Sequence, residues 1–144
     1  MGFLIDTCIW IDVEQGVISP ADVATVTGNE PVFLSPVTIA ELKFGAENAK
    51  SSDLRQKRLA ALARLKKKPF LTIDETTGEI FGDIAVQIRK KGAGHRYRVQ
   101  DIWLASQAIQ HNCRFLTHNR KDFDDIPGLA LVIWEDVART TGRP

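Results

Sequence analysis

The residues of this sequence best suited to chemistry are four acids that come from distant parts of the chain. Each follows an apolar, strand-like run or lies near the start of a predicted helix: Asp6, Glu41, Asp101 and Asp122. A charge at the end of a buried strand costs several kcal/mol unless it is paired or bound. Because ligands of parallel α/β sheets collect where the strands end, we expect these carboxylates to share one site.

Such a cluster of acids needs a cation. Two carboxylates about 4 Å apart repel by on the order of 4 kcal/mol at an effective dielectric near 20. A divalent ion removes this repulsion, and oxygen ligands without histidine or cysteine favour Mg²⁺ or Mn²⁺ over zinc. The usual chemistry of one or two such metals is phosphoryl transfer, so the acids predict a metal-dependent enzyme of that reaction type.

The elements that must position the acids alternate along the chain. Strand-like runs are FLI, PVFLS, PFLTI, CRFLT and ALVIW, and helical patterns lie between them: SPVTIAELKFGAENAK, residues 53–68, DETTGEIFGDIAVQIRKKG and VQDIWLASQAIQHN. Asp74 with Thr76 or Thr77 is expected to cap a helix, while Gly92 and Asn112 are expected near helix ends. This order predicts a three-layer α/β domain with a mostly parallel central sheet flanked by helices.

Composition indicates one ordinary globular domain over residues 1–144. The sequence is 44% hydrophobic and 26% charged, with a formal net charge of +1. Attraction to nucleic acid must therefore come from local patches. Cys8 and Cys113 lack metal-ligand spacing and suit a reducing, cytoplasmic setting. No signal peptide or membrane span is apparent, so we expect no membrane partner.

Four segments together carry a family resemblance. They are LIDTCIWID, LSPVTIAELKFGA, RVQDIWLASQAIQHNCRFLTHNRKDF and IPGLALVIW. In this order they resemble the PIN domain, specifically the VapC type of bacterial toxin, over nearly the whole chain. The resemblance implies a Mg²⁺-dependent endoribonuclease that cleaves RNA with a metal-activated water and is blocked by a cognate antitoxin. It also implies a homodimer, for which exposed apolar positions around Ile39 and Phe44 are candidates.

The resemblance also implies roles for single residues. Asp6, Glu41 and Asp101 match the first three family acids, with Asp6 and Asp101 as the principal metal ligands. Thr7 matches a small hydroxyl residue that supports the first acid or a water at the metal. The next family position is commonly Asn, and here it is Cys8.

The fourth acid is open between two positions, because some relatives place it where Asn119 stands and others where Asp122 stands. We favour Asp122, with Asn119 as a polar neighbour. The same two residues have the spacing of a helix-capping pair, which is the structural alternative. The structural alternative for Glu41 is a surface acid on a helix. The alternative for Asp101 is a charge near a helix N-terminus that the helix dipole favours.

The segment KKGAGHRYR is the most basic and glycine-rich stretch, and it leads directly to the third acid. Its cations can hold phosphates while its tyrosine stacks on a base, so we predict RNA contacts by Lys90, Lys91, Arg96, Tyr97 and Arg98. The basic run at 64–68 is more typical of a solvated helix end.

Other functions fit the sequence less well. A phosphoaspartate receiver needs an acceptor acid ending a central strand, but Asp53 lies in polar KSSDLR. A haloacid-dehalogenase-type phosphatase needs an acid where Cys8 stands. A catalytically inactive PIN-fold binding module and a PIN nuclease of RNA maturation remain as alternatives.

Overall fold

A parallel sheet of short strands forms the centre of the computed structural model, which describes residues 1–92, 94 and 98–135. Its strands are β1 (Phe3–Ile5), β2 (Val32–Phe33), β3 (Arg114–Thr117) and β4 (Ala130–Ile133), in the order β2-β1-β3-β4. In the register, Leu4 of β1 lies beside Phe33 on one side and Phe115 on the other. Residue 6 therefore leaves the sheet between two neighbouring strands.

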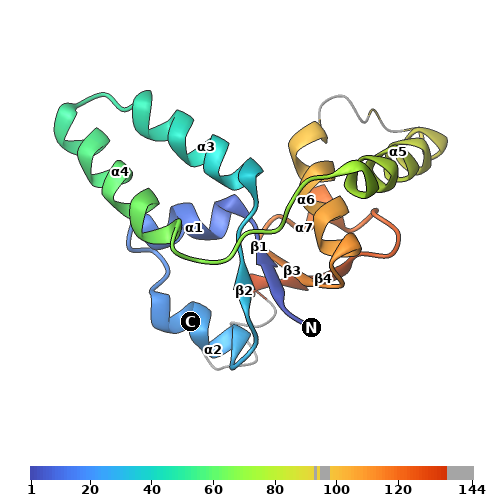
Figure 1. Cartoon of the computed structure of the whole chain (residues 1–144), viewed down its shortest axis with the longest axis horizontal. Helices are drawn as coiled ribbons and strands as arrows, with labels where there is room; N and C mark the ends of the chain where they lie inside the picture. The colour runs from blue at the N-terminus through green and yellow to red at the C-terminus, as the bar shows by residue number, and fades with distance from the viewer. Residues whose placement is uncertain (93, 95–97, 136–144) are drawn as a thin grey trace.

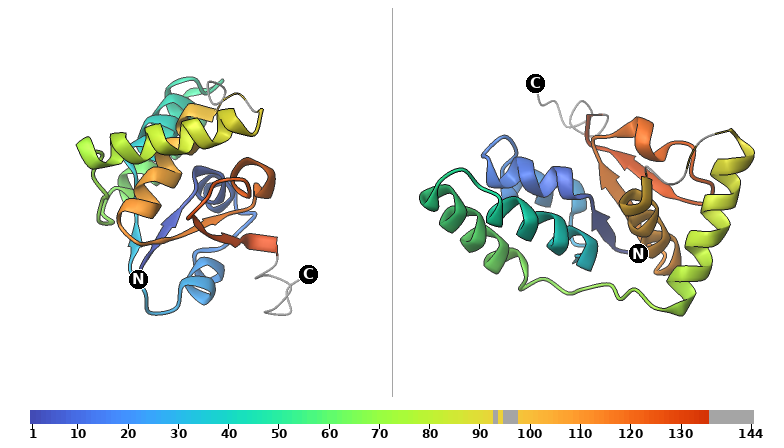
Figure 2. Two further views of the ribbon diagram at one scale, coloured as in Figure 1. Left: turned by 90° about the vertical axis from the view of Figure 1, so that its right-hand side faces the viewer. Right: turned by 90° about the horizontal axis from the view of Figure 1, so that it is seen from above.

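Helices connect and cover the strands. They are α1 (Thr7–Glu14), α2 (Pro20–Thr27), α3 (Pro36–Glu47), α4 (Ser52–Leu65), α5 (Glu75–Lys90), α6 (Val99–Gln110) and α7 (Arg120–Phe123). Figure 1 shows α3 and α4 paired on one side of the sheet and α5 with α6 on the other, and Figure 2 shows the same division from two more directions. The predicted three-layer α/β architecture is confirmed. Within the described ranges, no helix combines the length and apolarity of a membrane span.

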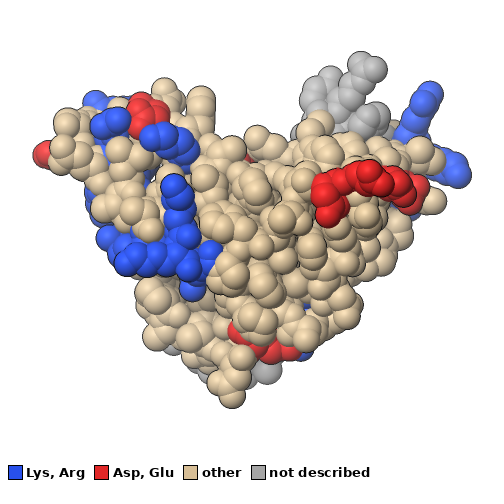
Figure 3. Space-filling view, viewed as in Figure 1, with Lys and Arg blue, Asp and Glu red and all other residues tan. Residues whose placement is uncertain are grey.

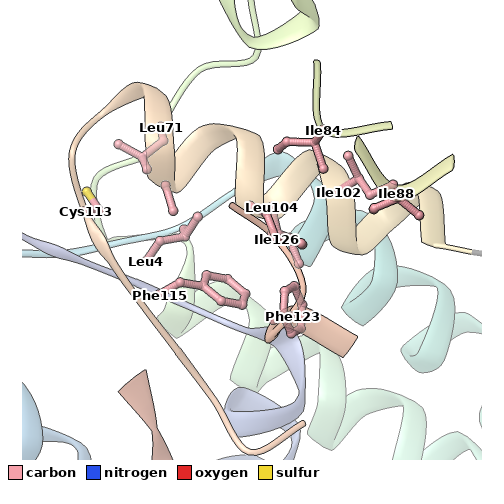
Figure 4. Packing of buried hydrophobic residues seen from close by; sticks show 12 residues of the cluster. Leu4, Leu71, Ile84, Ile88, Ile102, Leu104, Cys113, Phe115, Phe123 and Ile126 are labelled. Carbon is pink, nitrogen blue, oxygen red and sulfur yellow. The ribbon is translucent and has the colours of Figure 1, made fainter. Parts of the chain in front are cut away.

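The core has two halves because successive residues of a strand point to opposite faces of the sheet. Leu4 packs with Phe115 and Phe123 in one half, beneath α5 and α6, as Figure 4 shows. Phe3 and Ile5 pack in the other half. β1 is thus buried on both faces, and the residue that follows it starts from a fixed position.

Most of the predicted boundaries are confirmed. Asp74 forms a capping box with Thr77 at the start of α5, and Gly92 adopts φ +82° just after this helix ends. Asn112, with φ 53°, follows α6 in the left-handed region. These positions end their helices for the expected reason, since glycine and asparagine tolerate that conformation best.

The predicted strand PFLTI is wrong. The segment makes only an isolated parallel bridge between Leu34 and Phe70. The side-chain amide of Gln107 donates hydrogen bonds to the main-chain carbonyls of Leu71 and Thr72, at 2.9 and 3.1 Å. Because a buried glutamine on α6 satisfies these backbone groups, the chain passes the sheet edge without joining it as a strand.

Candidate active site

Asp6 stands at the end of β1 and is also the N-cap of α1, with only 5% of its surface exposed. Its Oδ1 accepts the backbone N–H of Thr7 at 2.8 Å. Its Oδ2 accepts the hydroxyl of Thr117 at 2.8 Å and the thiol of Cys8 at 3.4 Å. Burial raises the pKa of Asp6, although these hydrogen bonds favour the carboxylate. The side chain is therefore fixed in direction and lacks a cationic partner among these contacts.

Glu41 approaches Asp6 from α3. The helix begins at Pro36 after the cap Ser35, whose hydroxyl accepts the backbone N–H of Val37 at 3.0 Å. The Thr7 hydroxyl lies 3.1 Å from Glu41 Oε1 and 3.0 Å from the hydroxyl of Thr38. Burial raises the pKa of Glu41, and the charge of Asp6 adds to the effect. Thr7 thus supports the first acid through its backbone and the second through its side chain.

Asp101 lies in the first turn of α6. Its pKa is raised to about 6, first by burial and then by the negative charges of Asp6, Asp122 and Glu41, while Arg98 acts in the opposite direction. Mutual repulsion of this kind requires proximity. Asp101 therefore lies within electrostatic range of the three other predicted acids.

Asp122 lies on α7 and its side chain is exposed. Asn119 is the N-cap of this helix but makes no side-chain capping hydrogen bond. Instead its Oδ1 faces Nδ1 of His118 at 3.1 Å, and its backbone N–H donates to the Thr117 hydroxyl at 3.0 Å. The capping-pair alternative therefore lacks its side-chain contact, and which residue completes the acid set stays a prediction.

Two contacts of Asp6 were missed in the sequence. Thr117 is fully buried at the end of β3 and donates to Asp6. Cys8 keeps its proton because burial, together with the charge of Asp6, raises its pKa to about 12. A hydroxyl residue closing the run CRFLT was the available signal for Thr117. This threonine points to Asp6 only if β3 lies beside β1, and the order of the strands along the chain does not reveal that they are neighbours.

The donor set suits a hard cation held partly by water. In the part of the chain that the structure describes, no three acidic, histidine or cysteine side chains stand close enough to bind one ion together. Mg²⁺ typically takes only one or two carboxylates and keeps several waters. The pKa of Asp101 is raised first by burial and then by the charges of Asp6, Asp122 and Glu41, and a cation would offset both effects. Asp6 and Asp101, with Glu41 nearby, therefore fit such an ion.

The predicted RNA-binding residues have different surroundings. Lys90 is exposed at the end of α5. Lys91 donates to the main-chain carbonyl of Asp125 at 2.9 Å, and Arg98 pairs with the Asp125 carboxylate at 2.8 Å. Arg96 and Tyr97 lie outside the described residues. Intramolecular partners thus occupy two of the predicted cations, and RNA contact at this segment stays a prediction.

A groove of about 690 Å³ opens beside Glu41, one of the four acids. Helices α1, α2, α3 and α4 contribute most of its lining. Its apolar lining includes Trp10, Leu42 and Leu62, and Glu41 reaches one edge. Cations on or just after α4 line it as well: Arg58, Arg64 and Lys68. Figure 3 shows basic side chains gathered over α4.

Comparison with known proteins agrees with this architecture. Residues 3–129 match the PIN domain, and the chain belongs to this family. Ribonuclease VapC1 of Rickettsia felis is 31% identical over 138 residues, covering 92% of this chain and 96% of the relative. Ribonuclease VapC5 of Mycobacterium tuberculosis is 28% identical over 129 residues, covering 90% of each chain.

Solved structures show the same fold. The structure of VapBC-1 from nontypeable Haemophilus influenzae contains a chain with a TM-score of 0.77 and 26% identity, covering 94% of this chain and 99% of that one. A chain of DNA-bound VapBC from Salmonella typhimurium has a TM-score of 0.79 at 21% identity, with coverage of 93% and 98%. The described sheet and helices therefore have close counterparts.

Proposed function

We propose that this chain is a divalent-metal-dependent endoribonuclease that acts in the cytoplasm as the toxin of a toxin–antitoxin pair. The observation that carries the proposal is the set of four acids at this site: burial, and then the charges of Asp6, Asp122 and Glu41, raise the pKa of Asp101. Membership of the PIN family and the similarity to ribonucleases named VapC support the choice of RNA as substrate.

The four acids would hold one or two Mg²⁺ or Mn²⁺ ions, with Asp6 and Asp101 as the principal ligands and Glu41 and Asp122 completing the set. A bound divalent cation would polarise the scissile phosphate and lower the pKa of the attacking water. The chain itself supplies orientation. The Thr117 hydroxyl and Cys8 thiol hold Oδ2 of Asp6. Because these donors are attached to β3 and α1, the carboxylate direction is set before metal or RNA arrives.

Replacing either principal ligand tests the nuclease. Asp6→Asn and Asp101→Asn keep the side-chain shape and remove the charge, so we expect both to abolish RNA cleavage while the protein stays folded. Cleavage is measured with Mg²⁺ and with EDTA, and product ends are expected to carry 5′-phosphate and 3′-hydroxyl groups. Asp83→Asn, at an exposed acid on α5, is the matched control and should cleave normally. Wild-type cleavage by either site variant would refute the proposal.

The partner we propose is an antitoxin. Several structures with this fold are described as VapBC or toxin–antitoxin complexes. An antitoxin tail lying over the acidic cluster could present arginine to the carboxylates. Co-expression with the neighbouring small gene should give a complex that co-purifies and protects growth, whereas loss of both effects would refute this partner.

We also propose a homodimer, and the exposure of the two candidate contact residues favours one of them. Phe44 on α3 is 71% exposed. Ile39, the other position considered, is partly buried against the core. Phe44 is therefore the better candidate, and sedimentation of Phe44→Ser against wild type tests it.

A further inference from the structure

The ends of three helices meet at Asp125, immediately beyond the acidic cluster. Arg98 donates from two nitrogens to the two carboxylate oxygens of Asp125, each at 2.8 Å. The same guanidinium also donates to the main-chain carbonyl of Asp122. Lys91, just past α5, donates to the main-chain carbonyl of Asp125 at 2.9 Å. This pair is shielded, because the side chains of Arg98 and Asp125 are only 17% and 32% exposed.

The sequence positions of the pair relate it to the site. Arg98 is the N-cap of α6, three residues before Asp101. Asp125 follows α7, three residues after Asp122. One ion pair therefore joins the helix that carries the third acid to the helix that carries the fourth. The contact between Arg98 and the Asp122 main chain restrains that junction directly.

We propose that Arg98 and Asp125 are positioning residues for the metal-binding acids, an inference that rests on the proposed function. A bidentate arginine–carboxylate pair fixes both distance and orientation, so it sets where α7 stands against the start of α6. It also keeps the guanidinium turned toward Asp125, at the rim of the acidic cluster. Arg98 already interacts electrostatically with Asp101 and Asp122.

The direction of the expected effect follows from that charge. Without the Asp125 carboxylate, Asp101 and Asp122 are the other acids whose charges act on Arg98. The guanidinium would then compete with a divalent cation for them, while α7 loses its restraint. Both changes weaken Mg²⁺ binding, and residues that orient metal ligands typically affect affinity by roughly 10-fold or more.

The test compares Asp125→Ala with Glu47→Ala. Glu47 forms the same kind of forked pair with Arg55, at 3.0 and 3.2 Å, between α3 and α4. Mg²⁺ binding is measured by calorimetry on the full chain, RNA cleavage is titrated with Mg²⁺, and melting is recorded without metal. We expect Asp125→Ala to raise the Mg²⁺ midpoint roughly 10-fold and Glu47→Ala to leave it within about twofold.

Further variants separate positioning from folding. Arg98→Lys keeps the charge but loses the fork, and we expect a raised midpoint there too. The double variant Arg98→Gln with Asp125→Ala should be no worse than Asp125→Ala alone, because the competing cation is gone. If Asp125→Ala does not fold, Asp125→Asn replaces it.

The outcomes are distinct. An Asp125 variant with the Mg²⁺ midpoint of Glu47→Ala would overturn the positioning role and leave the nuclease proposal intact. A double variant Arg98→Gln with Asp125→Ala that binds Mg²⁺ more weakly than Asp125→Ala alone would also overturn it. A wild-type chain that binds no Mg²⁺ would overturn both proposals.

Discussion

Removing the charge of Asp101 should stabilise the metal-free protein at neutral pH. The pKa of this carboxyl is raised from 3.8 to about 6, mainly by burial and by three neighbouring acids. A carboxyl with a raised pKa contributes stability only while it is protonated in the folded state, and that contribution is lost as pH rises from about 4 through about 6. The asparagine of Asp101→Asn cannot ionise, so this variant does not pay the penalty.

The magnitude follows from the shift. About two pKa units correspond to about 3 kcal/mol, and solvent screening of a half-buried side chain reduces this to about 1–2 kcal/mol. We therefore expect the stability gain of Asp101→Asn to be about 1–2 kcal/mol larger at pH 8 than at pH 4. For a chain of this size the difference in melting temperature is roughly 3–8 °C.

The assay is thermal and urea unfolding of both proteins in EDTA across this pH range. Adding Mg²⁺ supplies the second half of the test, since a ligand stabilises only the state that binds it. Wild type should gain melting temperature and Asp101→Asn should gain little. A stability difference that stays constant between pH 4 and pH 8 would refute the electrostatic argument.

Substitutions at four other positions probe the site and the residues that support it. Asp122→Asn should weaken Mg²⁺ binding and cleavage at least about tenfold, or about 1.4 kcal/mol, with little change in melting temperature. Adding Asn119→Asp to this variant should restore part of the cleavage. An unchanged Mg²⁺ midpoint in Asp122→Asn would exclude Asp122 from the site. Thr117→Val removes a buried donor to the first acid and should cost about 1–3 kcal/mol in urea unfolding, whereas Thr117→Ser should retain most of it. Gln107→Leu leaves two backbone carbonyls without their donor, and calorimetry should show a loss of about 2–4 kcal/mol.

The shared location of the acids was predictable because it depends on a rule of topology. A residue directly after a parallel strand, such as Asp6, reaches the carboxyl edge of the sheet. A helix that leads into a parallel strand begins at the same edge, and Asp101 lies in the first turn of such a helix. The long helices followed from apolar periodicity and capping residues such as Asp74. The side-chain contacts between strands could not be read in this way.

Several features escaped prediction, among them helices α1, α2 and α7, and two of the misses have a clear physical reason. Helix α1 begins at Thr7 with no linker after β1, so the apolar residues after Asp6 look like a continuing strand. PFLTI does not form a strand of the sheet. The amide of Gln107 instead satisfies backbone carbonyls 35 and 36 residues away. Local patterns carry no information about such a distant donor.

The pairing of Asp6 with Thr117 has a consequence for synthesis. The two residues are 111 positions apart, and β1 has β3 as one of its two neighbours. Ribosomes add about 5–20 residues per second, so roughly 6–22 s separate the synthesis of Asp6 from that of the strand that completes its surroundings. Throughout this interval the nascent chain holds its first acid without the others assembled around it. A proposed toxin of this topology therefore cannot complete the surroundings of its first acid until β3 has been synthesised.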